Sequence, residues 1–244
     1  MFHVLNKSPK TATILVYGDI GPSWFGDGVS ANDFAQKLEE VGNVSEIVVR
    51  INSYGGAMMD GLTMYRLLAD HPARIVTQVD AMAASAASLI AMAGDEIRVA
   101  EAAQIMIHDA SSFGYGNAED FRAQANVLDT ASEAAAELYA ARIGNGKTAA
   151  ELRQKMKAET WFTAKQALDY GIATSILANK VGDDVPEEAA KASNVTKLNF
   201  KNKPGEEEQI SPGKQAALKA FARGQVAISL SRAAIARIGK TNAA

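Results

Sequence analysis

Hydrophobic residues are concentrated in short runs along the first third of the chain. Three of these runs, "TATILVYG" (11–18), "SEIVVRI" (45–51) and "RIVTQV" (74–79), are rich in β-branched residues. Continuous apolar runs of this length, bounded by glycine or polar residues, are typical of buried strands. We therefore expect three buried strands before residue 80.

The segments between these runs have helical spacing. "SANDFAQKLEEVG" places Ser30 and Asp33 where an N-terminal cap is expected, and Gly42 at the end. Residues 57–71 form a second expected helix, with a predicted core face of Met58, Leu62, Tyr65 and Leu68. The alternation of strand and helix predicts an α/β fold with parallel strands and right-handed crossovers.

Further elements follow this unit. "EIRVA" (96–100) and "AQIMIH" (103–108) predict two short strands, Thr148 and Thr163 have the features of helix caps, and "YGIATSIL" (170–177) predicts a last strand. A helix from 118 to 143 would be about 38 Å long, more than a small domain needs. We expect this helix to project and to take part in assembly.

The composition changes after Leu177. Residues 179–244 are polar at first, contain proline and glycine, and end in a segment from Lys214 with six Lys or Arg and no acid. These features indicate two parts: a domain over 1–178, and a linker with a basic arm over 179–244, partly disordered or helical. The arm can be a solvated basic helix or a docking peptide.

Charge and residue content narrow the function. The net charge of -3 gives no general attraction to nucleic acid or to an anionic membrane, and we expect no partner of either kind. With no cysteine and three widely separated histidines, the sequence predicts no metal site. The N-terminus lacks a hydrophobic signal core, so we expect a soluble, cytoplasmic protein.

The candidate chemistry lies in three short stretches. "AMAASAASLIAMAG" (81–94) has two hydroxyls, Ser85 and Ser88, each of which can be a buried serine bonded to a helix carbonyl or a nucleophile at a helix start. "INSYGG" brings Gly56 to the end of a neighbouring strand, in an ordinary turn or beside a ligand. "IMIH" ends a strand in His108, either packed in the core or acting as a base.

Together with "TWFTAKQALDYGIA", these stretches occur in an order and spacing that resembles the ClpP family of self-compartmentalising serine peptidases, over residues 11–177. The resemblance implies a ClpP/crotonase-like spiral of ββα units and no cofactor. It assigns Ser85 as the nucleophile, His108 as the base, and the amides of Gly56 and Ala86 as oxyanion donors. It also places Glu159, two residues before the aromatic Trp161, where the family normally has an aspartate.

The chain departs from housekeeping relatives in this acid, in its short N-terminal segment and in its C-terminal arm. In these respects it is similar to the ClpP-like head maturation (prohead) proteases of tailed bacteriophages. That likeness implies a homo-oligomeric ring, a heptamer or double ring, which cleaves capsid and scaffold proteins in the host cytoplasm or inside the prohead. The alternatives are a housekeeping-type peptidase with an ATPase, an inactive ring-forming structural protein, and a crotonase-like acyl-CoA enzyme.

Overall fold

The computed structural model describes residues 2–5, 10–22 and 28–178. Its eight strands are β1 (Phe2–Leu5), β2 (Thr11–Tyr17), β3 (Glu46–Ser53), β4 (Arg74–Ala84), β5 (Glu96–Ala100), β6 (Gln104–Ile107), β7 (Thr160–Thr163) and β8 (Ser175–Leu177). The helices are α1 (Ala31–Val41), α2 (Met58–Ala69), α3 (Ala86–Ala91), α4 (Ala118–Ile143), α5 (Ala149–Lys157) and α6 (Ala164–Tyr170). The predicted α/β class is confirmed.

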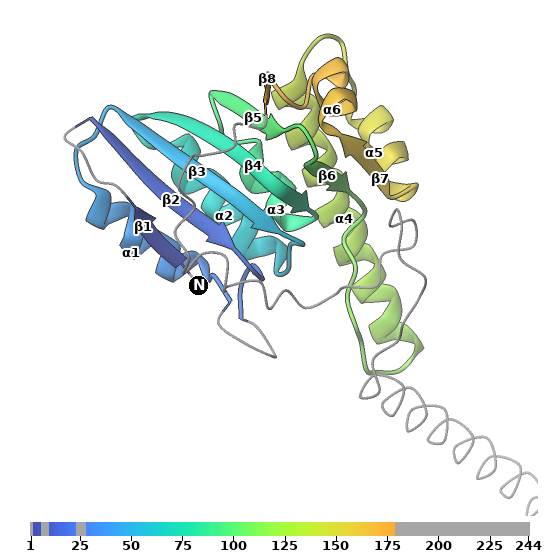
Figure 1. The fold of residues 1–244 in the computed structure, drawn as a ribbon. Coiled ribbons are helices and arrows are strands. Elements are labelled where there is room, and N and C mark those ends of the chain that lie inside the picture. The colour runs from blue at the N-terminus through green and yellow to red at the C-terminus, as the bar shows by residue number, and fades with distance from the viewer. Residues whose placement is uncertain (1, 6–9, 23–27, 179–244) are drawn as a thin grey trace, which may run out of the picture. The chain divides into compact units, whose positions relative to one another are not determined.

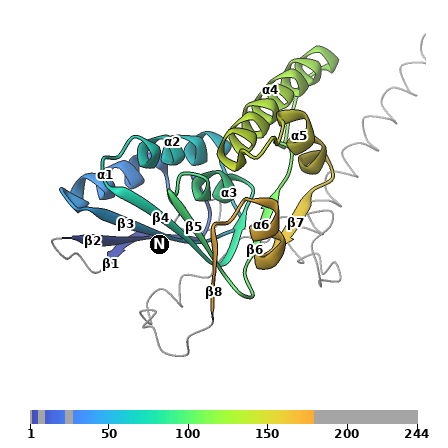
Figure 2. The same cartoon turned by 90° about the horizontal axis from the view of Figure 1, so that it is seen from above.

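One sheet carries all of these strands, in the order β1-β2-β3-β4-β5-β8, with β6 paired to β4 and β7 paired to β6. The strands from β2 to β5 are parallel, as the sequence predicts, and α1, α2 and α3 cover one face of them (Figures 1 and 2). Residues of β3 alternate between buried and partly exposed. The main core therefore lies between this face and the helices.

Strand β4 is longer than predicted and changes its partner along its length. It pairs with β5 through residues 76–79 and with β6 through residues 82–84. Periodicity does not separate a strand from a helix in the alanine-rich residues that follow Val79. The pairing with β6 extends β4 to Ala84, so the strand runs directly into the serine of the candidate site.

Two strands were not predicted, and both are short and antiparallel to their neighbours. They are β1, which pairs with β2, and β7, which pairs with β6. The helix starts were predicted correctly: Ser30, Thr148 and Thr163 each accept a hydrogen bond from a backbone N–H in the first turn of the helix they precede.

The prediction for the buried face of α2 is only partly right. Leu68 is buried as predicted, but the other buried residues are Gly61 and Met64, whereas Met58, Leu62 and Tyr65 are partly exposed. A Cβ at Gly61 would lie 3.0 Å from the Cβ of Ala86. The glycine therefore lets α2 pack closely on the start of α3, while Met58, Leu62 and Tyr65 pack against the edge of the core.

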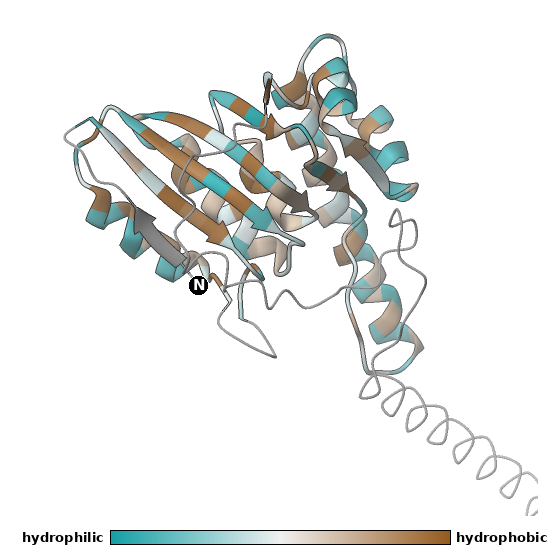
Figure 3. Cartoon of the chain, in the orientation of Figure 1, coloured by the Kyte–Doolittle hydropathy of each residue, from teal (hydrophilic) through white to brown (hydrophobic). Residues whose placement is uncertain are grey.

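Helix α4 has the predicted bounds, and its N-terminal half extends beyond the sheet (Figure 1). Its buried residues all lie between Ser132 and Ile143, whereas the half before them carries polar and apolar residues side by side (Figure 3).

No helix within the described ranges combines the length and the apolar character needed to cross a membrane. The predicted arm, residues 179–244, lies outside the described residues, so its boundary stays a prediction.

Candidate active site

Ser85 occupies a sharp turn between β4, which ends at Ala84, and α3, which begins at Ala86. Its φ is 53°, in a region that residues with a side chain rarely adopt. Its N–H donates to the carbonyl of Met106 at 3.0 Å, so the turn is fixed to β6. A strand-to-helix turn with strained backbone is the way in which α/β hydrolases expose a nucleophilic serine.

His108 directly follows β6 and faces Ser85. The parallel register pairs Ala84 with Met106, which brings the residues after both strands to the same edge of the sheet. His108 Nε2 lies 2.7 Å from Ser85 Oγ. The structure therefore brings together the two residues that the sequence assigns as nucleophile and base, at a hydrogen-bond distance.

The environment keeps the His108 ring neutral. Burial lowers the pKa of His108 below its ordinary value of about 6.5, and the negative charges of Glu159 and Asp109 oppose this shift. Because burial has the larger effect, the imidazole is uncharged at neutral pH. A neutral ring can accept a proton from the serine hydroxyl, whereas a charged ring cannot.

Glu159 lies in the turn between α5 and β7, directly before Thr160, and its backbone has a positive φ of 51°. The antiparallel ladder between β6 and β7 ends at the pair of Ile107 and Thr160, and His108 and Glu159 are the residues that adjoin this last pair. Glu159 is buried, and Trp161 Nε1 donates to its Oε1 at 3.4 Å. The negative charge of Glu159 raises the pKa of His108, so the predicted acid lies near the predicted base.

The double-glycine turn lies against Ser85. A Cβ at Gly55 would come within 2.7 Å of both the Ser85 Cβ and the Ala84 carbonyl oxygen, and one at Gly56 would collide with the Ile20 carbonyl. Both glycines have positive φ. Only glycine therefore allows this turn to approach the serine so closely.

Two backbone amides are candidates for an oxyanion site. The bridge between Ile20 and the turn uses the carbonyl of Gly55 and the N–H of Ala57, and Gly56 N–H takes no part in it. Ala86 is the first residue of α3, where an N–H has no acceptor within its own helix. These are the two donors that the sequence assigns to the oxyanion.

Sequence reasoning missed Ser53, which shapes the same turn. Its side chain is fully buried, and its Oγ accepts a hydrogen bond from Gly55 N at 3.0 Å. A serine two residues before the glycines is the local signal that could have identified it, because serine often bonds to nearby backbone in turns.

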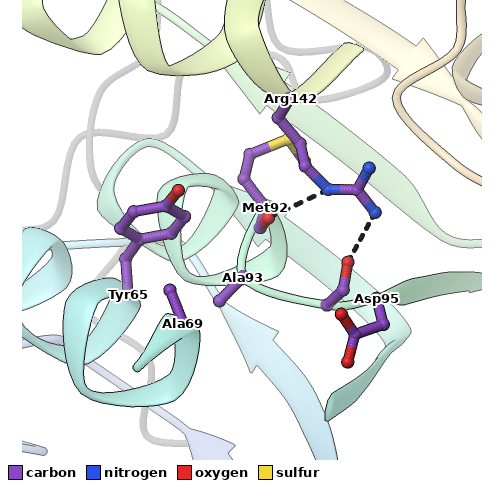
Figure 4. Close-up of a pocket in the computed structure, with 7 residues that line it drawn as sticks. Tyr65, Ala69, Met92, Ala93, Asp95 and Arg142 are labelled. Carbon is purple, nitrogen blue, oxygen red and sulfur yellow. Dashed lines mark hydrogen bonds between the residues drawn. The ribbon is translucent and has the colours of Figure 1, made fainter. Parts of the chain in front are cut away.

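A surface pocket of about 340 Å³ lies at the opposite end of α3. Arg142 of α4 lines it and donates to the carbonyls of Met92 and Gly94, while Tyr65 and Ala69 come from α2 (Figure 4). Arg142 thereby satisfies carbonyls where α3 ends, which is a structural role. Within the described ranges no three His, Asp or Glu side chains are grouped as metal ligands would be.

The fold and this site define a class: an α/β protein with a serine and a histidine arranged for acyl transfer. Residues 26–180 match the family model of the Clp protease. The chain belongs to the Clp protease family and is a serine-type endopeptidase of the ClpP kind.

Individual relatives agree with this assignment. The chain is 31% identical over 161 residues to the ATP-dependent Clp protease proteolytic subunit 1 of Leifsonia xyli subsp. xyli, covering 63% of this chain and 81% of that protein. It is 26% identical over 183 residues to the proteolytic subunit of Ligilactobacillus salivarius, covering 73% and 89%. The structure of a point mutant of ClpP1 from Listeria monocytogenes has the same fold, with a TM-score of 0.59 and 22% identity over 69% of this chain and 92% of that one. The predicted ClpP-like fold is confirmed.

Proposed function

We propose that the chain cleaves peptide bonds with Ser85 as nucleophile, His108 as general base and Glu159 as the acid that orients the histidine. Ser85 Oγ attacks the scissile carbonyl while His108 Nε2 takes its proton, and the oxyanion binds the N–H groups of Gly56 and Ala86. His108 then protonates the leaving amine, and water, activated by the same ring, releases the acyl group from Ser85.

The distance of 2.7 Å between His108 Nε2 and Ser85 Oγ carries this proposal, supported by the lowered pKa of His108. The test is labelling with a fluorophosphonate and hydrolysis of a fluorogenic peptide. Ser85→Ala should abolish both and keep the fold, because the surrounding residues are already alanines. A matched control is Ser112→Ala, which removes an exposed hydroxyl. Peptide hydrolysis by Ser85→Ala near the wild-type rate would overturn the proposal, and failure of the wild type to react would indicate an inactive ring protein.

We further propose that the natural substrates are capsid and scaffold proteins, so that the enzyme acts as a head maturation protease. The support comes from the sequence: the family match ends at residue 180, and the remaining residues include the basic segment from Lys214. A basic segment of this kind suits a docking peptide for acidic partner proteins.

The relatives favour a second function. They are named as proteolytic subunits of ATP-dependent proteases, which in this chain would mean degradation of proteins delivered by an ATPase. Co-expression with the coat and scaffold proteins of the same genome distinguishes the two. If the coat or scaffold protein is shortened when it is co-expressed with the wild-type enzyme, but not with the Ser85→Ala variant, the result supports the maturation role. Cleavage that requires an ATPase and ATP would overturn it.

Members of the family form ring oligomers and act on polypeptides. For this chain we propose a heptameric ring or double ring in which α4 contacts neighbouring subunits. Four large hydrophobic residues are exposed here: two precede the helix, Phe113 and Tyr115, and two lie on it, Phe121 and Val127. Apolar side chains gathered in this way are typical of a protein interface.

A further inference from the structure

A chain of buried hydroxyl groups connects α4 to the backbone of Ser85. Ser88, in the first turn of α3, donates its hydroxyl hydrogen to the carbonyl oxygen of Ser85 at 2.6 Å. The hydroxyl of Tyr139, on α4, lies 2.7 Å from Ser88 Oγ. Both side chains are buried, and they lie 51 residues apart in the sequence.

The direction of these hydrogen bonds follows from proton counting. Ser88 has a single hydroxyl proton, and it is used on the Ser85 carbonyl. Tyr139 must therefore donate to Ser88 Oγ. Burial raises the pKa of Tyr139 well above its usual value, so the phenol keeps the proton that this bond needs. The order is Tyr139 hydroxyl, Ser88 hydroxyl, Ser85 carbonyl.

The Ser85 carbonyl belongs to the same peptide group as the Ala86 N–H. A trans peptide is planar, so its C=O and N–H point in opposite directions and turn together. The Ser85 oxygen also accepts from Ser88 N at 2.9 Å. Two donors from Ser88 thus fix the plane of the peptide and with it the direction of the Ala86 N–H. Because Ser85 has strained φ, this plane needs support from neighbouring groups.

We infer that Ser88 and Tyr139 are positioning residues for the oxyanion site, and that they act by orienting the Ala86 amide. The inference rests on the proposed role of Ala86. Neither residue touches the substrate. A donor aimed in advance at the developing charge stabilises the transition state more than the bound substrate, so its misalignment should lower kcat and leave KM unchanged.

The expected loss of kcat in the Ser88 and Tyr139 variants has an upper limit. Loss of a whole oxyanion donor costs about 10² to 10³ in kcat, and Ser88→Ala leaves the backbone bond from Ser88 N in place. We expect Ser88→Ala to lower kcat about 10-fold and Tyr139→Phe about 3-fold, below that limit. Because Tyr139 acts through Ser88, the double variant should match Ser88→Ala alone.

The experiment measures kcat and KM for a fluorogenic peptide, together with the Ki of the peptide aldehyde of the same sequence. The aldehyde adds to Ser85 and places its oxygen in the oxyanion site, so its Ki should weaken by the same factor as kcat. Thr77→Val is the matched control, since Thr77 is a buried residue whose hydroxyl donates to the carbonyl of Ala91 at the other end of α3. It should lower Tm while kcat and Ki stay near wild type.

The outcomes separate the inference from the function on which it rests. Tyr139→Phe removes a single oxygen and keeps the ring packed. If this variant and Ser88→Ala both lower Tm but retain the wild-type kcat and Ki, the hydroxyl chain is only structural and the inference is overturned. Peptide hydrolysis that survives Ser85→Ala would instead overturn the proposed function, and the positioning role with it. A fall in kcat and aldehyde affinity with unchanged KM supports the inference.

Discussion

Both carboxylate oxygens of Asp109 contact the guanidinium group of Arg153. Arg153 Nε lies 2.8 Å from Oδ1, and Nη2 lies 3.1 Å from Oδ2. Arg153 also binds the side chains of Asp129 and Glu133 on α4. The carboxylate adjacent to His108 in sequence is therefore held by α5, whereas Glu159 is buried and its charge raises the pKa of His108 more than that of Asp109 does. This arrangement favours Glu159 over Asp109 as the acid of the triad.

Asp109→Asn tests this assignment. The variant should keep kcat at pH 8 within a few-fold of wild type, because Arg153 holds the Asp109 carboxylate and the proposed triad uses Glu159 to orient the ring. It should lower the free energy of unfolding by about 1 to 3 kcal/mol, since a hydrogen bond to a charged group is weakened. Peptide hydrolysis and chemical denaturation measure the two effects. A loss of kcat comparable to that of His108→Ala would make Asp109 the third catalytic residue.

Glu159→Gln should keep the fold and lower kcat by about 10³ to 10⁴, because an amide at this position favours the wrong tautomer of the imidazole. Glu159→Asp keeps the charge but shortens the side chain, and a displacement of about 1 Å costs on the order of 10² in rate. Steady-state kinetics on both variants checks the prediction, with circular dichroism to confirm folding. Near-normal turnover by Glu159→Gln would leave a Ser-His pair without a third member.

The pH dependence of kcat/KM should report the titration of His108. The ring acts as a base only when neutral, so activity should be lost as the pH falls through its pKa. Because burial lowers this pKa, the midpoint of the acid limb should lie below about 6.5.

The Glu159 charge raises the pKa of His108, so Glu159→Gln should move that midpoint to still lower pH. Residual activity of the variant is measured across the same buffers as the wild type. A midpoint above that of wild type would contradict the placement of a negative charge beside the ring.

Light scattering should give a mass several times the 25.8 kDa of one chain. Replacing Phe121 and Val127 together by serine removes apolar side chains from α4, and should dissociate the assembly into smaller species while each subunit stays folded. The control is Met59→Ser, which changes an exposed apolar residue on α2. A wild type that is monomeric at micromolar concentration would contradict the proposed ring.

The elements that were predicted from the sequence have strong local signals. The range of α4 follows from a helical pattern between Asn117, which caps it, and Gly144, which ends it. Strand β7 and the end of β4 have no such signal, because both depend on pairing with β6. The proximity of Ser85 and His108 could be predicted because parallel strands end at one edge. The hydrogen bond between Ser88 and Tyr139 could not be predicted, since no rule of spacing relates two hydroxyls 51 residues apart.

The antiparallel pairing of β6 with β7 also affects when the enzyme can first act. Ser85 and His108 are 23 residues apart, but Glu159 reaches them only when Thr160–Thr163 has joined the sheet. Contacts between such distant parts of a chain form late in folding, because a long loop must close first. A chain still on the ribosome therefore lacks the third member of the proposed triad until most of the domain has been made. With the proposed triad, the order of the elements along the chain therefore delays peptide cleavage by a new chain until synthesis of its catalytic domain is nearly finished.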